Sequence, residues 1–272
     1  RLGEIAHGGV GDPPQLQGWS PDGQALAWTL SLSQPDRSQL QLYNTADGRT
    51  HTLTSDRYDS NAAAFSPDGQ WLYFASNRNF ATTGNGSPWG DRNTGPFFGF
   101  RSKLYALALQ PGLRSPFAAK DELESVTEKK ADEQRAEDKK ATDKAPTERK
   151  PDDKDKKPAA DKKGGKPAIQ FDGLAERLYE LPVAAGSYRS LRADGKRLWF
   201  LDQDLDRKTQ LKSVGIDNQG GPAEILAHDV RNYDISADGK KLMLVRNQGQ
   251  GAPEVLIVDA APKLPAELGK LT

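Results

Sequence analysis

Residues 64–74 read Ala-Phe-Ser-Pro-Asp-Gly-Gln-Trp-Leu-Tyr-Phe, which is two apolar segments joined by an Asp-Gly turn. The same pattern recurs at three other places along the chain. The four turns contain Asp22-Gly23, Asp68-Gly69, Asp194-Gly195 and Asp238-Gly239. Asp-Gly between apolar segments is a strong β-hairpin signal, because a type I′ turn needs positive φ angles and Asp-Gly supplies them. Each of the four stretches therefore predicts a hairpin.

Further short strands follow each hairpin at a regular spacing. A third strand is predicted over residues 39–43, 103–107, 209–213 and 254–258, and a fourth over 50–54, 177–181 and 222–226. Gly23 and Gly69 are 46 residues apart, and Gly195 and Gly239 are 44 apart, which is the period of a four-stranded propeller blade. The pattern predicts an all-β protein, a β-propeller of about four four-stranded blades. A β-sandwich is the alternative, but the turn motif at a fixed strand position favours the propeller.

The gap of 126 residues between Gly69 and Gly195 predicts one blade that carries two insertions. The longer insertion, residues 120–166, holds 15 Lys/Arg and 14 Asp/Glu and no aromatic residue. Such a segment cannot bury enough apolar surface to offset the chain entropy lost on folding, so we expect a disordered insert. The predicted organisation is blade 1 and most of blade 2 in residues 1–119, the insert in 120–166, and the end of blade 2 with blades 3 and 4 in 167–272.

The shorter insertion, residues 79–101, is rich in Gly and Asn and holds several aromatic side chains outside the repeat. They include Trp89, Phe97, Phe98 and Phe100. Blade packing does not require aromatic residues there. They are expected either to pack under their own loop or to contact a neighbouring domain or substrate.

Composition excludes several classes of function. The 272 residues include 38 basic and 38 acidic side chains, which argues against a nucleic-acid surface or a polybasic membrane patch. Cysteine is absent, which excludes disulfides and thiol nucleophiles, and three widely spaced histidines leave little for a metal site. No apolar run approaches the roughly 18 residues of a membrane span. We expect no metal, no cofactor and no membrane partner.

Repeated side chains are expected to serve structure. Asp22, Asp68, Asp194 and Asp238 recur once per blade because the turn needs them, so they are not expected to form one carboxylate site. Trp19, Trp28, Trp71 and Trp199 also recur with the repeat, which predicts an inter-sheet core rather than ligand stacking. A serine nucleophile needs an oriented base, and none of His7, His51 and His228 lies in a catalytic motif. We expect no catalytic residue in this chain.

The first strand of each blade is expected to face the central channel. The predicted segments are 61–65, 187–191 and 232–235, and Asn61, Ser187 and Asn232 lie at or near their starts. These three polar residues are the predicted channel-lining positions. The expected role is a wall of a passage that admits unfolded peptides and excludes folded proteins.

The Ser-Pro-Asp-Gly hairpins resemble repeats of translocation-protein-B-like domains, prolyl oligopeptidases, dipeptidyl peptidases and tricorn proteases. Three other stretches, residues 53–60, 72–78 and 171–188, resemble the tricorn family more specifically, and the tail over 261–272 is similar to the stretch that leaves its second propeller. The resemblance implies the later blades of the second, seven-bladed propeller of a tricorn-type serine protease. It places the remaining blades before Arg1, and a PDZ domain and the catalytic domain after Thr272.

The resemblance implies a non-catalytic propeller portion of an oligopeptide-degrading serine peptidase. The implied partners are peptide substrate, the other domains of the protease and further copies in a homo-oligomer. A cytoplasmic location is expected, or a periplasmic one if an export signal precedes Arg1. The alternatives are a stand-alone protein-binding propeller of the translocation-protein-B type and the propeller of a prolyl-oligopeptidase relative. The gene sequence after Thr272 separates them: a PDZ and serine-peptidase domain, a stop codon, or an α/β-hydrolase.

Overall fold

The computed structural model describes residues 13–33, 36–78, 102–118, 168–204, 206–217, 221–247, 251–261 and 264. The predicted insert (120–166) and the four loop aromatics Trp89, Phe97, Phe98 and Phe100 lie outside the described residues, as does His7. All strands belong to one unit of the chain, Arg1–Phe117 with Lys166–Thr272, and Ala118–Gly165 lie outside that unit.

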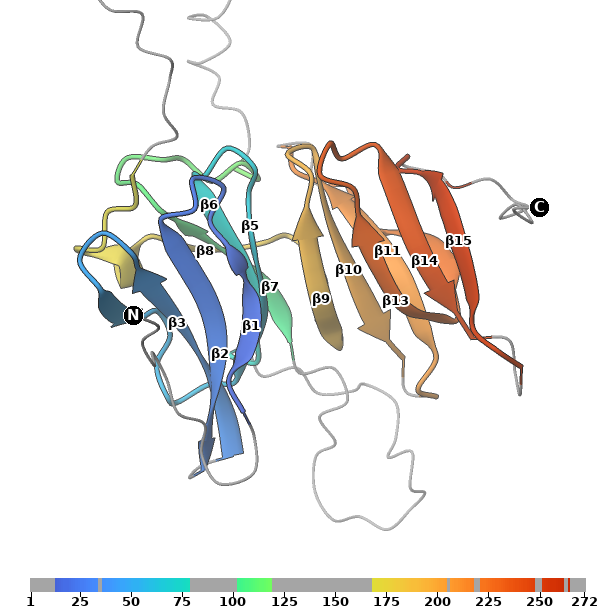
Figure 1. Ribbon diagram of the computed structural model, residues 1–272, viewed down its shortest axis with the longest axis horizontal. Coiled ribbons are helices and arrows are strands. Elements are labelled where there is room, and N and C mark those ends of the chain that lie inside the picture. Colours follow the sequence, from blue (N-terminus) through green and yellow to red (C-terminus); the bar gives the residue numbers. More distant parts are fainter. Residues whose placement is uncertain are drawn as a thin grey trace, which may run out of the picture. The chain divides into compact units, whose positions relative to one another are not determined.

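Within the described ranges, fifteen strands form four separate antiparallel sheets, each built in chain order (Figure 1). Sheet 1 contains β1 (Gln15–Trp19), β2 (Ala25–Ser33), β3 (Asp36–Asn44) and β4 (Arg49–Thr52). Sheet 2 contains β5 (Ser60–Phe65), β6 (Trp71–Ser76), β7 (Lys103–Ala108) and β8 (Leu178–Glu180), with the 3-10 turn η1 (Leu174–Glu176) before β8. Sheet 3 contains β9 (Tyr188–Ala193), β10 (Arg197–Gln203), β11 (Thr209–Gly215) and β12 (Glu224–His228). Sheet 4 contains β13 (Val230–Ile235), β14 (Lys241–Arg246) and β15 (Glu254–Asp259).

This strand order confirms the all-β propeller and excludes the sandwich, because four sheets that each follow the chain are four blades. The first strand of each sheet is an edge strand, and β1 contacts β5, β5 contacts β9, and β9 contacts β13. The first strands are therefore neighbours, as the innermost strands of propeller blades are. No helix in the described part of the chain has the length and apolar character that a membrane span needs.

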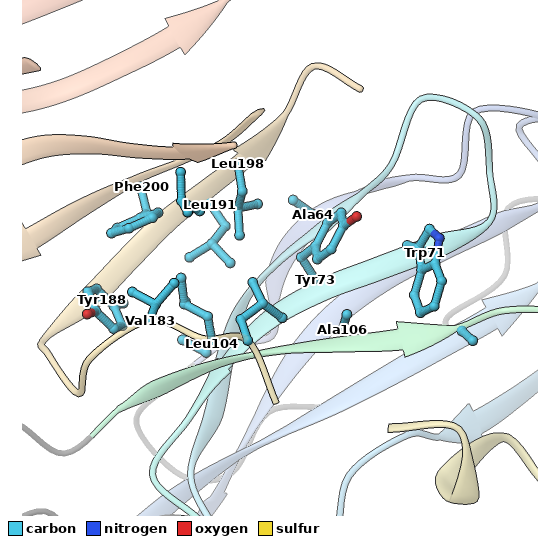
Figure 2. Close-up of a cluster of buried hydrophobic side chains, with 14 residues drawn as sticks. Ala64, Trp71, Tyr73, Leu104, Ala106, Val183, Tyr188, Leu191, Leu198 and Phe200 are labelled. Atoms are coloured by element: carbon cyan, nitrogen blue, oxygen red, sulfur yellow. The ribbon is translucent and has the colours of Figure 1, made fainter. Parts of the chain in front are cut away.

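Apolar side chains fill the spaces between neighbouring sheets. The cluster between sheets 2 and 3 joins Tyr73 and Leu104 to Leu198 and Phe200, which are all at most 1% exposed (Figure 2). Tyr188 packs edge-on against Phe200 with ring centroids 4.9 Å apart. A second cluster joins sheets 3 and 4, and two others join sheets 1 and 2. The alternation of apolar residues along each strand thus buries both faces of the two middle sheets.

Trp71 and Trp199 lie in these clusters and are 5% and 0% exposed, and Trp28 is also buried, at 4% exposed, although it belongs to none of the four clusters. The prediction for Trp19 is wrong, because its side chain is 54% exposed on β1. Its counterpart in the next repeat, Phe65, packs against buried residues of sheet 1. Among the described residues, no sheet covers the corresponding side of β1, and this leaves the Trp19 indole in solvent.

The four hairpin turns form where they were predicted, but their type differs. In sheets 1, 2 and 4 the glycine N–H donates to the carbonyl of the serine three residues earlier, at 2.9, 3.0 and 2.8 Å. The central residues of the turn are then Pro-Asp or Ala-Asp, and among the turn residues only the glycines have positive φ. A type I′ turn needs two positive φ angles, which proline cannot supply, so the type I′ prediction is wrong.

A serine–aspartate pair holds each of these three turns. The Ser66 hydroxyl donates to Asp68 and accepts from the Trp71 N–H at 2.9 Å, while Asp68 also accepts from the Gln70 N–H at 2.9 Å. Ser20 and Ser236 repeat these bonds in sheets 1 and 4. The aspartates therefore serve their own turns, as predicted from the repeat.

The turn of sheet 3 is shorter because Arg192 stands where the other turns have serine. Without that hydroxyl, the Asp194 N–H donates directly to the Arg197 carbonyl at 3.1 Å. The Asp194 carboxylate accepts from the Arg197 N–H at 2.7 Å and from the Trp199 indole at 2.9 Å. One substitution in the motif therefore changes the loop but preserves the hairpin.

Candidate functional site

The three predicted channel positions lie on or beside first strands. Asn61 is the second residue of β5 and is half-buried, and its Oδ1 atom has no hydrogen-bond partner among the described residues. Asn232 lies in β13 and is exposed. Ser187 precedes β9, where its N–H donates to Asp202 Oδ1 at 3.0 Å. Whether these side chains line a channel stays a prediction.

Strand register groups these positions differently from the sequence repeat. Asn61 pairs with Ala75, and Asn232 pairs with Val245, at matching positions of the second strands. The residues at this position in sheets 1 and 3 are Gln15, which pairs with Thr29, and Arg189, which pairs with Leu201. The equivalent set is therefore Gln15, Asn61, Arg189 and Asn232. Ser187 falls two residues before Arg189, because the turn of sheet 3 is shorter and the bulges described next shift the pairing.

Every first strand contains a β-bulge near this polar set. A bulge leaves backbone groups without partners in the ladder, and neighbouring sheets supply them. The Gln17 side-chain carbonyl of β1 accepts from the Ala63 N–H of β5 at 3.0 Å. The Tyr233 hydroxyl of β13 donates to the Ser190 carbonyl of β9 at 2.5 Å. Bulged residues thus link β1 to β5 and β9 to β13.

Charge is concentrated on the first strands of sheets 3 and 4. Arg189, Arg192 and Arg231 are exposed, and Arg189 donates to Thr209 Oγ1 at 3.0 Å. Arg192 lies 3.4 Å from Asp234 of the next sheet, in a pair whose side chains are 45% and 60% exposed. The corresponding parts of β1 and β5 carry neutral amides at Gln15, Gln17 and Asn61. The first-strand edge therefore offers hydrogen-bonding groups in all four sheets and positive charge in two.

The two described histidines occupy structural surroundings. The His51 ring stacks on Phe171 at 3.9 Å between centroids, and its Nε2 atom lies 3.8 Å from Asp47. His228 is exposed on the edge strand β12. No serine hydroxyl is hydrogen-bonded to either ring in the part of the chain that the structure describes, and that part contains no cluster of three potential metal ligands.

A pocket of about 210 Å³ lies on sheet 2 beside the connector from β4 to β5. It is lined by Leu53, Ser55, Tyr58, Phe74, Arg78, Leu107, Ala175 and Leu178. The pocket contains one cation: the Arg78 Cζ atom lies 5.2 Å from the Tyr105 ring centroid, 5.5 Å from Tyr58 and 5.9 Å from Phe74. Burial raises the pKa of Tyr105 to about 12, with the Glu180 carboxylate acting in the same direction and the Arg78 guanidinium opposing both.

Sequence reasoning missed this pocket. Its side chains come from a connector, three strands and a 3-10 turn, and Leu53 and Leu178 are 125 positions apart in the chain. Arg78 follows an ordinary apolar strand, and nothing in the local sequence shows that the rings of Tyr58 and Tyr105 both contact its guanidinium. Only the packing of sheet 2 against the connector brings them together.

A protein-family model matches most of the chain. Residues 14–252 match the family model described as the tricorn protease second beta propeller domain. The Tricorn protease homolog 1 of Streptomyces coelicolor (strain ATCC BAA-471 / A3(2) / M145) is 29% identical over 242 residues, which are 83% of this chain and 20% of that protein. This chain therefore spans about a fifth of the length of that relative.

The solved structure of a tricorn protease has the same fold. The crystal structure of the tricorn protease superimposes with a TM-score of 0.61 and 14% identity, over 90% of this chain and 21% of that one. The structure of putative TolB from Agrobacterium tumefaciens gives a TM-score of 0.41 and 14% identity, over 81% of this chain and 52% of that one.

Proposed function

The chain belongs to the family of tricorn protease second β-propeller domains, and from this membership we propose that it is the non-catalytic propeller portion of a tricorn-like serine peptidase that degrades oligopeptides. The observation that carries the proposal is the family match over residues 14–252. The chain spans about one fifth of the tricorn relatives, so the proposal assigns the chemistry to other domains of a longer protein.

We further propose that the first strands form part of the wall of a substrate passage. The set Gln15, Asn61, Arg189 and Asn232 supports this, because neighbouring first strands present these side chains at one register position. Amide side chains both donate and accept hydrogen bonds, so they can serve the backbone of an unfolded peptide of any sequence. A passage lined in this way need not recognise particular substrate side chains.

One apolar face of sheet 4 is exposed, and this supports a larger propeller ring. Met243, Val255 and Ile257 are 37%, 55% and 56% exposed on one face of sheet 4, where Met243 pairs directly with Ile257. On the opposite face, Leu242 and Leu244 are fully buried against sheet 3. An exposed apolar sheet face marks an interaction surface. We propose that a further blade of the longer protein covers this face, as sheet 3 covers the other.

Two purified proteins test the proposal: the 272-residue chain and the full-length gene product. Each is incubated with a fluorogenic peptide and with an unlabelled oligopeptide, and cleavage is followed by fluorescence and mass spectrometry. The full-length protein is expected to cleave both, and the 272-residue chain neither. Cleavage by the short chain would overturn the non-catalytic assignment, and an inert full-length protein would overturn the peptidase assignment.

A further inference from the structure

Arg78 is a half-buried cation with no carboxylate partner among the described residues. Its guanidinium lies over three aromatic rings and has one long hydrogen bond, 3.4 Å from Nε to Ser76 Oγ. The carboxylate that approaches this group of rings, Glu180, is already paired with Lys103. Withdrawing a charge from water is unfavourable unless an opposite charge compensates, and a cation–π contact compensates only in part.

The space beside Arg78 is apolar. The aliphatic part of its wall consists of Leu53, Leu107 and Leu178, and Phe74 adds an aromatic ring. Ser55 and Tyr58 add hydroxyl groups, and the Ser55 side chain is exposed. At about 210 Å³ the pocket is smaller than the roughly 300–1,000 Å³ of sites for drug-sized ligands. It therefore suits a single amino-acid residue with an aliphatic side chain.

The walls of the pocket are held in place before any ligand arrives. Asp59 fixes the connector to both neighbouring sheets: its carboxylate accepts from the Ser38 N–H at 2.9 Å, and its own N–H donates to Asn77 Oδ1 at 2.8 Å. The Asn77 N–H returns a bond to the Asp59 carbonyl at 3.1 Å. Because Asn77 directly precedes Arg78, the same bonds that position Tyr58 also position the cation. Such preorganisation reduces the entropy lost on binding.

We propose that this pocket binds the carboxylate-bearing C-terminal residue of a peptide. The Arg78 guanidinium pairs with the terminal carboxylate, the aliphatic side chain lies among the leucines, and the preceding peptide group faces the hydroxyls of Ser55 and Tyr58. That the bound residue belongs to a peptide rests on the proposed function. The preference for a carboxylate on a small aliphatic body rests on the pocket alone.

Calorimetric titration of the 272-residue protein tests the site with three probes: N-acetyl-L-leucine, N-acetyl-L-leucinamide and 4-methylpentanoate. N-acetyl-L-leucine is expected to bind at least tenfold more tightly than its amide, because only the acid pairs with Arg78. It is also expected to bind more tightly than 4-methylpentanoate, which lacks the peptide group. Equal binding of acid and amide, or no binding of the acid, would overturn the site. Equal binding of the two acids would overturn its assignment to peptides.

Matched variants separate the site from general charge. Arg78→Gln is expected to weaken N-acetyl-L-leucine binding at least tenfold, while Arg49→Gln, which removes an exposed arginine on β4, leaves it unchanged. Unfolding curves show whether Arg78→Gln is folded, and Ala175→Trp, which fills the rim from an exposed position, provides a second test if it is not. Retained binding in both pocket variants contradicts the proposal. These binding measurements need no peptidase activity, so they fail or succeed independently of the proposed function.

Discussion

Hydrogen bonds of single side chains stabilise the hairpin turns and link neighbouring sheets. In the sheet 2 turn, the buried Ser66 hydroxyl joins the Asp68 carboxylate to the Trp71 N–H. We predict that Ser66→Ala lowers the free energy of unfolding by about 1–2 kcal/mol, because a buried N–H loses its acceptor. Urea unfolding measures the change. Ser236→Ala, at the more exposed turn of sheet 4, is the control and should cost less, and equal losses would contradict the burial argument.

Tyr233 makes the corresponding link between sheets, since its buried hydroxyl donates to the Ser190 carbonyl. We predict that Tyr233→Phe costs about 1–2 kcal/mol at pH 7.5. Burial raises the pKa of Tyr233 well above its usual range. Below about pH 10 the phenol is neutral in both states, but above it the unfolded chain ionises first, so the wild type loses stability as the pH rises.

The stability difference between wild type and Tyr233→Phe should therefore narrow from pH 9 to pH 11, because phenylalanine cannot ionise. Urea titrations at several pH values give the difference directly. Tyr43→Phe, on β3, serves as the control. A difference that stays constant across this range would show that Tyr233 ionises with the same pKa in both states.

At this scale the sequence predicts where the turns lie but not their type. The Asp-Gly pairs mark all four hairpins, and the role of the aspartates in their own turns follows from their repetition. The type I′ prediction neglected Pro21 and Pro67, whose fixed φ angles require a different turn. The exposure of Trp19 could not be predicted from the repeat, since identical positions differ in what covers them.

The β-bulges of the first strands set which side chains lie in the proposed wall of the substrate passage. Ala62 in the bulge of β5 has φ of 52°, a left-handed conformation that glycine adopts without strain. We predict that Ala62→Gly changes the free energy of unfolding by less than about 0.5 kcal/mol or stabilises the protein, because relief of strain offsets the added chain entropy. The neighbouring Ala64→Gly, which lacks a positive φ and is buried, should cost about 1–2 kcal/mol. Equal losses in thermal unfolding would contradict this account of the bulge.

The strands were predictable because short apolar segments are separated by recognisable turn motifs. All predicted third strands lie within β3, β7, β11 and β15. The β-bulges were not predictable, because one extra residue in a strand does not change the apolar pattern in a recognisable way. This explains the offset at Ser187, where the register instead assigns Arg189 to the position of Asn61 and Asn232.

At the scale of the whole molecule, the insert over residues 120–166 remains a prediction. Its charge density without aromatic anchors predicts that it contributes nothing to the packed sheets. Replacing it by a short Gly-Ser linker should leave the far-UV circular dichroism of the strands intact and shift the melting temperature by no more than a few degrees. A large fall in melting temperature, with the linker length varied as a control, would show that the insert packs against the propeller.

The sequence repeat predicts the blades. It does not predict pockets such as the one at Arg78, because these depend on contacts between segments outside the repeated motif. The Arg78 pocket needs the connector from β4 to β5 to pack against three strands of sheet 2, and Asp59 and Asn77 hold that connector in place. Such sites arise from packing between distant segments, and each segment alone looks ordinary.

The proposed substrate passage of a tricorn-like peptidase, lined by the first strands, can be tested by enzyme kinetics. We would measure kcat/KM of the full-length protein for a long and a short peptide, in wild type, Asn232→Trp and Gln15→Trp. Both positions are exposed on first strands, and Thr52→Trp on the outer strand β4 is the control. We predict that both first-strand variants lose at least threefold more activity on the long peptide than on the short one, while Thr52→Trp keeps the wild-type ratio. Equal losses on both peptides, or no loss on either, would contradict it.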